Sequence, residues 1–438
     1  MTDLPKILIF GQPFDDFSGG GITLSNLFRG WPTDKIASLW APWDNSQSSD
    51  DICNIKYRIG REERFWKFPF NLYRKSFPPS GPDFPSNINS FPTERTKPGI
   101  KALVSSYIIN PFFYWLGQFN RSSSITISAQ MKSWLSTFNP DVLYFQVSTL
   151  EGIKFARHLI DYLRIPAIIH MMDDWPSTIS MRGLFAKYWS RRINKEFMLL
   201  LDKVNLCLSI SDAMSDEYLQ RYNKRFVAFH NPVDLSSFIH KENVKKVNDN
   251  LFRVLYIGRI GTANKTSLEF FATTVSLMKK QDQAIELHIY TKDIEANDLA
   301  KLKGLSGIKV YPAVPHGSVP NLLAAYDLLL LPLDFNEDGL RFARLSIPTK
   351  ASEYMISGTP VIVFAPSETA VSQFFEYHKC GLCVSENTSE ALQKALSSLV
   401  SDVNLRIELS NNAFKIAEDR FDAIKVRERF RNMIRELV

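Results

Sequence analysis

The sequence predicts an α/β protein of two successive domains, each built around a parallel β-sheet. At 438 residues the chain is too long for one hydrophobic core, which stops growing at roughly 250–300 residues. Short apolar runs without helical period alternate with helical stretches, and this alternation is typical of parallel sheets covered by helices. The alternation stops at residues 230–234 (His-Asn-Pro-Val-Asp), and a charged stretch over residues 241–250 follows. We therefore place the end of the first domain at residue 235.

In the first domain, an apolar run at residues 7–10 leads through Gly19, Gly20 and Gly21 into an apolar stretch at 22–27, which predicts a strand, a glycine loop and a helix. Helices are expected at residues 152–163 and 212–222. Further strands are expected at residues 141–147, 167–170, 203–209 and 226–229. Prolines interrupt the pattern between about residues 45 and 125, where we predict an insertion.

A second α/β series predicts the second domain, over residues 236–418. Its strands are expected at residues 252–257, 285–290, 308–311, 328–333 and 359–364. A last helix is expected over residues 423–437, because Ile424, Val426, Phe430, Met433 and Ile434 lie on or near one helical face.

Composition narrows the class of protein further. The chain is 45% hydrophobic and 22% charged, as in ordinary globular proteins, and no apolar run approaches the 18 or so residues of a spanning helix. The start of the chain lacks a secretory signal, so a cytoplasmic protein is expected. Four cysteines do not make a disulfide framework, and the pair Cys380 and Cys383 lacks partners at zinc-site spacing. The net charge of +6 favours anionic partners such as nucleotides or membrane surfaces.

The first candidate ligand-binding loop is at residues 258–266 (Gly-Arg-Ile-Gly-Thr-Ala-Asn-Lys-Thr), between a strand and a helix expected to begin near Ser267. A turn of this kind lies at the carboxyl edge of a parallel sheet, where ligands bind. Arg259 and Lys265 would bring a forked guanidinium and a point charge there, which suits phosphate; solvated loop cations are the alternative. The loop is neither a Walker loop nor a G-x-G-x-x-G turn, which argues against ATPases and dehydrogenases.

The second candidate is at residues 344–365, where a helix opened by Pro348 and stopped at Gly358 precedes a buried strand. Ser346, Thr349 and Lys350 lie at the start of that helix, which favours an anion. Glu353 follows one turn later and is suited to accept two hydrogen bonds from the diol of a ribose. Pairing of Glu353 with Lys350 on an exposed helix is the competing interpretation.

Together these motifs resemble the donor half of family-4-type retaining glycosyltransferases of the GT-B fold. The resemblance rests on the order and separation of Gly258-Arg259 with Lys265, of Pro348-Thr-Lys-x-x-Glu-Tyr354, and of Gly358-x-Pro-Val361. The glycines at 19–21, His170 and the segments 209–214 and 230–234 match the same family in sequence order. The resemblance covers most of the chain and is weakest between about residues 40 and 130.

The resemblance implies two Rossmann-like, doubly wound domains that face each other across a cleft. Residues 1–235 would be the acceptor side, residues 236–418 would bind a nucleotide-sugar donor, and the helix in residues 419–438 would pack back on the first domain. Arg259 and Lys265 would bind the donor diphosphate, and Glu353 its ribose. The helix start with Ser346, Thr349 and Lys350 would meet phosphate. Tyr290, Tyr311 and Val314 are our candidates for the wall of the base site.

The first domain would contribute the remaining groups. The backbone at Gly19, Gly20 and Gly21 would approach the donor, and His170 would stand near the transferred sugar, with Asp173 and Asp174 close behind. Taken alone, a histidine at a strand end is more often a satisfied structural residue. No ligand cluster surrounds the two aspartates, and Arg259 and Lys265 supply positive charge, so we expect no metal and no cofactor besides the donor.

One position departs from the family pattern. The family commonly has two glutamates eight residues apart, but Leu345 stands eight residues before Glu353, and the nearby Glu337 and Asp338 are out of register. The carboxylate that usually faces the transferred hexose is missing or replaced, so the donor sugar stays open.

Two further segments combine basic and aromatic residues. The stretch Lys56–Lys75 has seven basic and two acidic residues, aromatic residues are interleaved with them through Phe77, and Tyr107–Phe119 is strongly apolar and aromatic. This composition suits an anionic membrane surface or a lipid-linked acceptor; an insertion that covers its own small core and single-stranded nucleic acid are the alternatives, the last the least favoured.

The sequence thus predicts a metal-independent hexosyltransferase that moves a sugar from a nucleoside diphosphate to a hydroxyl of a saccharide or lipid-linked acceptor, in surface polysaccharide, O-antigen, capsule or glycolipid assembly. We expect a cytoplasmic enzyme, peripheral at the inner face of the membrane, without nucleic-acid binding. Two rivals stay open: a nucleotide-sugar epimerase of the same fold, and a catalytically silent subunit that binds nucleotide or membrane.

Overall fold

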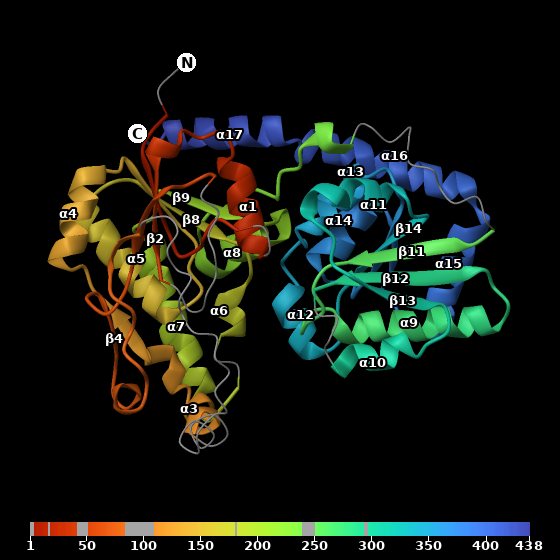
Figure 1. Cartoon of the computed structure of the whole chain (residues 1–438), viewed down its shortest axis with the longest axis horizontal. Helices are drawn as coiled ribbons and strands as arrows, with labels where there is room; N and C mark the ends of the chain where they lie inside the picture. Colours follow the sequence, from red (N-terminus) through yellow and green to blue (C-terminus); the bar gives the residue numbers. More distant parts are fainter. Residues whose placement is uncertain are drawn as a thin grey trace. The chain divides into compact units, whose positions relative to one another are not determined.

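The computed structural model describes residues 4–15, 18–41, 51–83, 109–179, 182–238, 250–292 and 297–438. These residues form two compact units (Figure 1). Unit 1 comprises Met1–Ser209, Ser215–Val227 and Phe430–Val438, and unit 2 comprises Ile210–Met214 and Ala228–Arg429. The main division therefore falls a few residues before the boundary predicted at 235, and the end of the chain counts with unit 1.

Unit 1 is built on an eight-stranded sheet with the order β10-β9-β8-β7-β1-β2-β3-β5. Neighbouring strands from β9 to β3 run parallel, and β5 pairs antiparallel with β3. The strands of this sheet are β1 (Ile7–Phe10), β2 (Ile36–Trp40), β3 (Ile55–Arg58), β5 (Gly81–Asp83), β7 (Val142–Phe145), β8 (Ala167–Met171), β9 (Leu206–Ser209) and β10 (Val227–Ala228). A separate antiparallel pair consists of β4 (Arg64–Trp66) and β6 (Ser123–Ile125).

The helices of unit 1 cover both faces of its sheet. They are α1 (Gly19–Phe28), α3 (Asn110–Trp115), α4 (Ala129–Phe138), α5 (Leu150–Leu163), α6 (Trp175–Thr178), α7 (Ala186–Leu201) and most of α8 (Asp212–Tyr222). Phe10 of β1 packs on Phe155 of α5, whereas Tyr144, on the other face, packs on Phe28 of α1 and on Phe430 near the chain's end. Helices on both faces bury the central strands of the sheet, and all residues of β1, β7 and β8 are buried.

Unit 2 has a six-stranded parallel sheet with the order β13-β12-β11-β14-β15-β16. Its strands are β11 (Phe252–Ile257), β12 (Ile285–Thr291), β13 (Ile308–Pro312), β14 (Leu328–Pro332), β15 (Val361–Phe364) and β16 (Leu382–Val384). Its helices are α9 (Lys265–Lys280), α10 (Asn297–Lys303), α11 (Val319–Ala324), α12 (Glu337–Ala343), α13 (Lys350–Ile356), α14 (Ala370–His378), α15 (Ser389–Ser401), α16 (Val403–Arg420) and α17 (Ala423–Arg435), the last of which continues into unit 1. This is the doubly wound strand order of dinucleotide-binding folds, with its reversal between β11 and β14.

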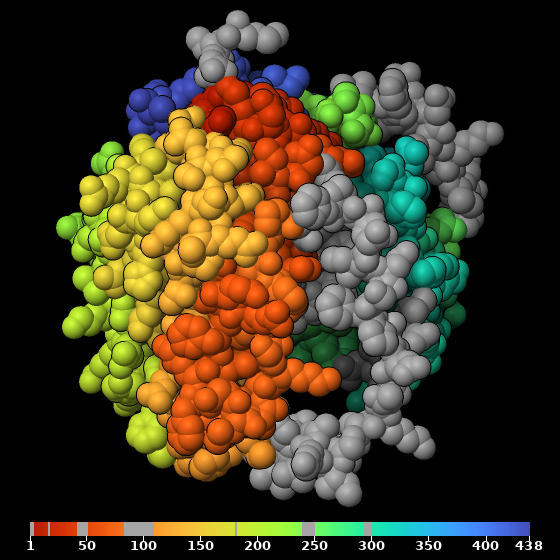
Figure 2. All heavy atoms as spheres, turned by 60° about the vertical axis from the view of Figure 1, so that its left-hand side comes forward, coloured from red at the N-terminus to blue at the C-terminus, as the bar shows by residue number. Residues whose placement is uncertain are grey.

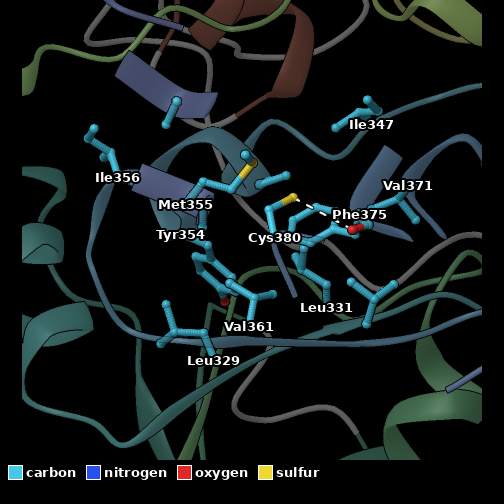
Figure 3. Packing of buried hydrophobic residues seen from close by; sticks show 14 of the residues in the cluster. Leu329, Leu331, Ile347, Tyr354, Met355, Ile356, Val361, Val371, Phe375 and Cys380 are labelled. Atoms are coloured by element: carbon cyan, nitrogen blue, oxygen red, sulfur yellow. Dashed lines mark hydrogen bonds between the residues drawn. The ribbon is translucent and has the colours of Figure 1, made fainter. Parts of the chain in front are cut away.

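Alternation along the buried strands of unit 2 divides its core into two layers. Leu329 and Leu331 face the layer with α13 and α14, whereas Leu328 and Leu330 face the layer with α9 and α15. Figure 3 shows the first layer, where Tyr354, Met355 and Phe375 surround the short Cys380 side chain. All four cysteines are free, and burial raises the pKa of the Cys380 thiol to about 12, so Cys380 packs as a small apolar residue.

The two parallel sheets confirm the predicted α/β class, and the structure corrects several details. Residues 19–21 are the first turn of α1 rather than a loop, because the Ser18 side chain accepts a hydrogen bond from Gly21 N (3.0 Å) and caps the helix. Strands β3 and β5 extend the main sheet into the region predicted as an insertion. The helix expected from Pro348 begins at Lys350, and α12 precedes it. The prolines at 85 and 92 lie outside the described residues.

Candidate functional site

The loop after β11 is a braced turn at the carboxyl edge of the unit 2 sheet. Gly258 has φ +140°, which side-chain-bearing residues rarely adopt. The Tyr256 hydroxyl donates to the Arg259 carbonyl (2.5 Å) and accepts from Asn264 Nδ2 (2.9 Å), and Gly261 N donates to Asn264 Oδ1 (3.0 Å). The backbone of this turn is therefore held from within, and the Arg259 side chain is exposed.

The start of α9 is tied to the end of β14 by Asp334, which sequence reasoning missed. The buried Asp334 carboxylate accepts hydrogen bonds from Ser267 N (2.7 Å) and Thr266 N (3.2 Å). It thereby satisfies the first N–H groups of α9 and fixes the position of Lys265, the first helical residue. The available signal was an aspartate directly after a buried strand at the reversal of the strand order.

Lys350, at the start of α13, lies at the end of β11. Its ammonium donates to the Ile257 carbonyl (3.3 Å) and lies 4.0 Å from the centre of the Tyr256 ring. A Cβ added to Gly258 would be 3.3 Å from Nζ, so glycine at 258 leaves room for the ammonium. Burial lowers the pKa of Lys350 to about 7. Lys350 therefore packs beneath the loop that contains Arg259.

Glu353, one turn into α13, contacts a residue from a different loop. Its Oε1 atom is 3.2 Å from Nε2 of His316, and the carboxylate is 15% exposed whereas the imidazole is 56% exposed. The next residue, Tyr354, accepts a hydrogen bond from Ile257 N (3.1 Å) and fixes α13 against β11. Sequence reasoning missed His316, whose only signal is its place in the loop after a predicted strand.

Two tyrosines end the neighbouring strands. The rings of Tyr290 (β12) and Tyr311 (β13) stack with centroids 4.8 Å apart and an angle of 23° between their planes, and both are half-buried. The Tyr290 carbonyl accepts a hydrogen bond from Gly258 N (3.0 Å), which links the stack to the Arg259 loop. Val314 packs on the adjacent core cluster.

The remaining predicted residues of unit 2 occupy the segment before α13. Ser346 N donates to the Ala343 carbonyl (3.1 Å), and the Thr349 carbonyl accepts from Asn231 Nδ2 (3.3 Å). Leu345, where the family pattern has a carboxylate, is buried, and its carbonyl accepts from Ser211 Oγ (2.5 Å). The structure thus brings Arg259, Lys350 and Glu353 to one sheet edge and places an apolar residue at 345.

In unit 1, the predicted glycines lie at the N-terminus of α1 against a buried aspartate. Asp15 accepts hydrogen bonds from Ser18 N (2.6 Å) and Ser18 Oγ (2.8 Å). A Cβ at Gly21 would lie 2.3–2.4 Å from the Asp15 carboxyl atoms, so only glycine fits there, and a Cβ at Gly20 would meet the side chains of Gln12 and Gln146.

His170 lies inside unit 1, at 1% exposure. Its Nδ1 atom is 2.7 Å from the Tyr144 hydroxyl, which also accepts from Gln146 Nε2 (3.2 Å). The Tyr144 hydroxyl therefore fixes the orientation of the imidazole ring through Nδ1. His170 is thus a buried, oriented imidazole, and its catalytic role stays a prediction.

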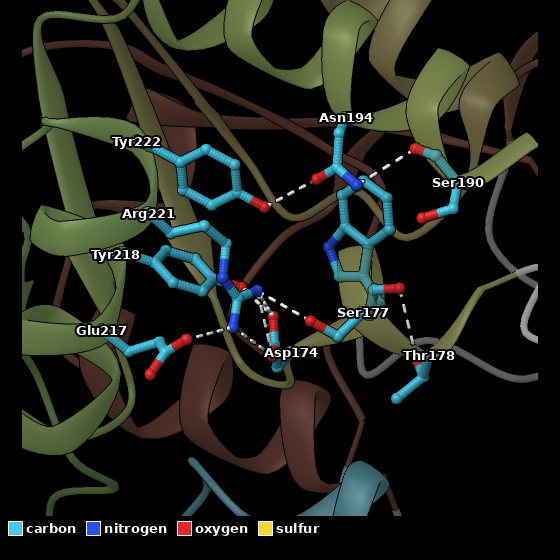
Figure 4. Close-up of polar contacts among 10 residues, drawn as sticks. Asp174, Ser177, Thr178, Ser190, Asn194, Glu217, Tyr218, Arg221 and Tyr222 are labelled. Carbon is cyan, nitrogen blue, oxygen red and sulfur yellow. Dashed lines mark hydrogen bonds and ion pairs between the residues drawn. The ribbon is translucent and has the colours of Figure 1, made fainter. Parts of the chain in front are cut away.

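The two aspartates after β8 differ in their surroundings. Asp174 is buried and accepts from both terminal nitrogens of Arg221 (2.9–3.1 Å) and from the Tyr218 hydroxyl (2.9 Å) (Figure 4). Arg221 also binds Glu217 and Ser177 (Figure 4). This network anchors the segment after β8 to α8, so Asp174 has a structural position, whereas Asp173 is only half-buried.

A pocket of about 140 Å³ opens at the strand-order reversal of unit 1, between the ends of β1 and β7. Its wall includes the Gln12 and Gln146 amides, the Trp40 ring and the Thr149 side chain. It also includes Arg64 and Glu151, both nearly fully buried, whose side chains form a two-point ion pair (Nη2–Oε2 2.7 Å, Nε–Oε1 3.3 Å). Sequence reasoning did not single out this pocket, because its residues come from five separate segments.

Comparisons with known proteins bear on the family and the fold of the chain. Residues 252–402 match the family model described as glycosyl transferases group 1, and a search of the curated proteins finds no match. Among solved structures, HepE of Anabaena in complex with UDP and glucose is similar over 99% of this chain and 100% of its own, with a TM-score of 0.63 and 14% identity. Sucrose-phosphate synthase from Thermosynechococcus elongatus has a TM-score of 0.63 at 13% identity, covering 98% of both chains.

WaaG, a glycosyltransferase involved in lipopolysaccharide biosynthesis, has a TM-score of 0.56 at 14% identity and covers 98% of this chain and 99% of its own. Such identities establish the fold alone, and the fold is that of the GT-B glycosyltransferases. The predicted resemblance to a GT-B glycosyltransferase is confirmed, whereas its family-4 type stays a prediction.

Within the described ranges, no group of three or more His, Cys, Asp and Glu is placed to hold a metal ion. None of the described helices is long and apolar enough to cross a membrane. Metal independence and cellular location stay predictions.

Proposed function

We propose that the protein is a retaining glycosyltransferase that moves a sugar from a nucleoside diphosphate to a hydroxyl acceptor. The observation that carries the proposal is the carboxyl edge of the unit 2 sheet, where Arg259, Lys350 and Glu353 gather beside the strand-order reversal. This edge lies within residues 252–402, which match the group 1 family. Cations at this position of a doubly wound sheet suit a diphosphate.

Each of these residues has a distinct task in the proposed reaction. Arg259, Lys265 and Lys350 stabilise the charge that develops on the leaving diphosphate. Glu353, oriented by His316, accepts hydrogen bonds from the ribose, and the Tyr290 and Tyr311 stack borders the base. The bond from the anomeric carbon to the diphosphate breaks, the acceptor oxygen bonds to the same face of that carbon, and the leaving phosphate takes the acceptor proton.

The acceptor sugar would enter the pocket of unit 1. The Arg64 charge there is compensated by Glu151, and the wall offers an indole ring and two amides. Aromatic faces and neutral amides suit a polyol better than an anion. His170 is our candidate for contact with a sugar hydroxyl.

Uridine diphosphate sugars are the first donors to test, because HepE was solved with UDP and with UDP-glucose. The similarity to WaaG favours a role in the assembly of surface polysaccharide or glycolipid at the inner face of the membrane. Leu345, in place of the usual carboxylate, is expected to change how the transferred sugar is held.

The test is incubation of the purified protein with a panel of sugar-labelled nucleoside diphosphate donors and an extract of cellular glycans and glycolipids. Transfer of label to an acceptor, with the anomeric configuration kept, supports the proposal. Free labelled sugar without any acceptor product would indicate the epimerase instead. Donor binding without turnover would indicate the silent subunit, whereas turnover that disappears in Lys265→Ala would exclude it.

A further inference from the structure

We propose that one end of unit 1 is a docking surface for anionic lipid bilayers. The surface, here the basic-aromatic end, consists of residues 65–77, 109–121 and 182–195. It includes parts of both segments predicted from composition and a third, at the start of α7, that composition did not single out. Tyr107, where one predicted segment began, lies outside the described residues. The proposal depends on unit 1 alone and not on the transfer reaction.

Direct contacts join the three segments into one surface. The Leu184 N–H donates to the Trp115 carbonyl (2.8 Å), and the Trp189 indole donates to the Leu116 carbonyl (3.2 Å). The buried Phe70 ring packs on Phe113 (5.4 Å) and Phe119 (5.0 Å). Figure 1 shows α3 at one end of the unit, and Figure 2 shows residues 51–83 (dark orange) beside residues 109–140 (lighter orange).

The surface exposes an unusual amount of bulky apolar side chain. Leu72 is 72% exposed and Tyr114 63%. Its other large exposed apolar and aromatic residues are Phe65, Phe68, Phe112, Trp115, Leu184, Phe185 and Tyr188. A contiguous apolar patch of this kind marks an interaction site, and Trp and Tyr at its rim are typical of a membrane interface.

The charge of the same surface has one sign. The three segments contain nine Lys and Arg and no Asp or Glu. The five in the third segment, Arg182, Lys187, Arg191, Arg192 and Lys195, are all exposed. By contrast, Lys56 and Arg64, which also belong to the predicted basic segment, are buried, and Arg64 pairs with Glu151. The predicted segment therefore divides: part of it packs on unit 1, and the remainder faces outward.

The combination fits a bilayer with anionic headgroups better than single-stranded nucleic acid. The exposed rings alone would suit either partner, but Leu72 and Leu184 favour a bilayer, because a leucine enters the acyl boundary and offers no ring on which a base could stack. Lysine and arginine side chains around them would meet the anionic headgroups at the same depth. The surface thus combines cations for the headgroups with apolar side chains for the acyl boundary, as interfacial membrane anchors do.

The experiment is co-sedimentation of the full chain with phosphatidylcholine vesicles that contain or lack phosphatidylglycerol. We expect binding to the anionic vesicles that falls with added salt. Arg191→Glu/Lys195→Glu should weaken partitioning at least about 25-fold, because two basic side chains are lost at about fivefold each and two repelled carboxylates are added. Tyr114→Ser/Leu184→Ser should weaken it about tenfold.

Matched controls change residues of the same type on unit 2. Lys394→Glu/Lys415→Glu removes two exposed lysines, and Tyr377→Ser/Val403→Ser removes two exposed apolar side chains. Both controls should bind as the native chain does, and thermal melting of all four variants verifies folding. The proposal is overturned by equal binding to both vesicle types, by equal losses in the controls, or by tighter binding to a fluorescent single-stranded oligonucleotide. Donor binding in solution, measured in parallel, tests the proposed transfer function separately.

Discussion

The two sheets handle charge differently at the places where their strand orders reverse. At the edge of the unit 2 sheet, Arg259 is exposed, and the Lys350 ammonium rests on a carbonyl oxygen and an aromatic ring. At the pocket of unit 1, Arg64 is ion-paired with Glu151 at 2.7 Å. The first edge therefore offers positive charge to a ligand, and the second offers a compensated pair. The proposed function uses this difference, with an anion at the edge of the unit 2 sheet and a neutral polyol in the pocket of unit 1.

The largest expected effect comes from breaking the compensated pair. Arg64→Met leaves the Glu151 carboxylate buried without its partner, which should lower the free energy of unfolding by about 3–5 kcal/mol. The double variant Arg64→Met/Glu151→Leu should recover most of that loss, because two apolar side chains replace both charges. Urea unfolding measures both. A loss in the double variant as large as in the single one would show that the pair is not what stabilises the pocket.

The next largest effect tests the cationic edge of unit 2. Lys265→Ala should lower turnover about 100- to 1,000-fold, because one stabilising charge on the leaving diphosphate is lost. Lys265→Ala and Arg259→Ala should both weaken UDP binding far more than uridine binding, which calorimetry can measure. The control Lys280→Ala removes a lysine at the opposite end of α9. Equal losses for UDP and uridine would contradict a diphosphate site at this edge.

Much of the fold could be predicted because its strands are buried on both faces. Such strands are short apolar runs, and β1, β7, β11 and β15 were all recognised this way. The sequence did not reveal β3 and β5, which lie toward the edge of the sheet and contain Lys56, Arg58 and Pro82. It also misassigned residues 19–21, because three glycines favour a loop unless a cap such as Ser18 is recognised.

The candidate site was predictable where chemistry and strand ends coincide in sequence. Arg259 directly follows β11, and Glu353 lies in the helix that leads into β15, so their place at one sheet edge could be inferred. Asp334 and His316 also follow strands, but their roles could not be inferred, because each acts through a partner distant in sequence: Ser267, 67 residues away, and Glu353, 37 residues away. An ion pair between Glu353 and Lys350 is the competing interpretation of the sequence, but in the structure Glu353 contacts His316.

A smaller effect is expected from the ribose contact. Glu353→Ala should weaken UDP binding about tenfold to 100-fold, the range for hydrogen bonds to a charged acceptor. The same variant should leave binding of the 2′,3′-dideoxy analogue almost unchanged, because that ligand lacks the diol. His316→Gln should reproduce part of the loss, since it removes the group that orients the carboxylate. Equal weakening for both ligands by Glu353→Ala would refute the ribose assignment.

The smallest effect concerns the pH dependence of the free energy of unfolding. Lys350 has a pKa of about 7 in the folded protein and an ordinary value of 10.5, because burial disfavours its charged form. Below pH 7 the lysine is protonated in both states and the cost of burying its charge is fully present. Between pH 7 and 10.5 only the unfolded chain binds the proton, so this lysine's contribution to stability becomes more favourable as pH rises.

From pH 7 to 9 the native chain should therefore gain about 2 kcal/mol of unfolding free energy relative to Lys350→Met. Urea unfolding of both proteins at several pH values measures the difference. Lys394→Met, a change of an exposed lysine on α15, is the control and should follow the native curve. If the Lys350→Met and native curves stay parallel, burial does not lower the pKa of Lys350. The difference between the cations at the edge of the unit 2 sheet and the ion-paired Arg64 in unit 1 would then rest on Arg259 and Lys265 alone.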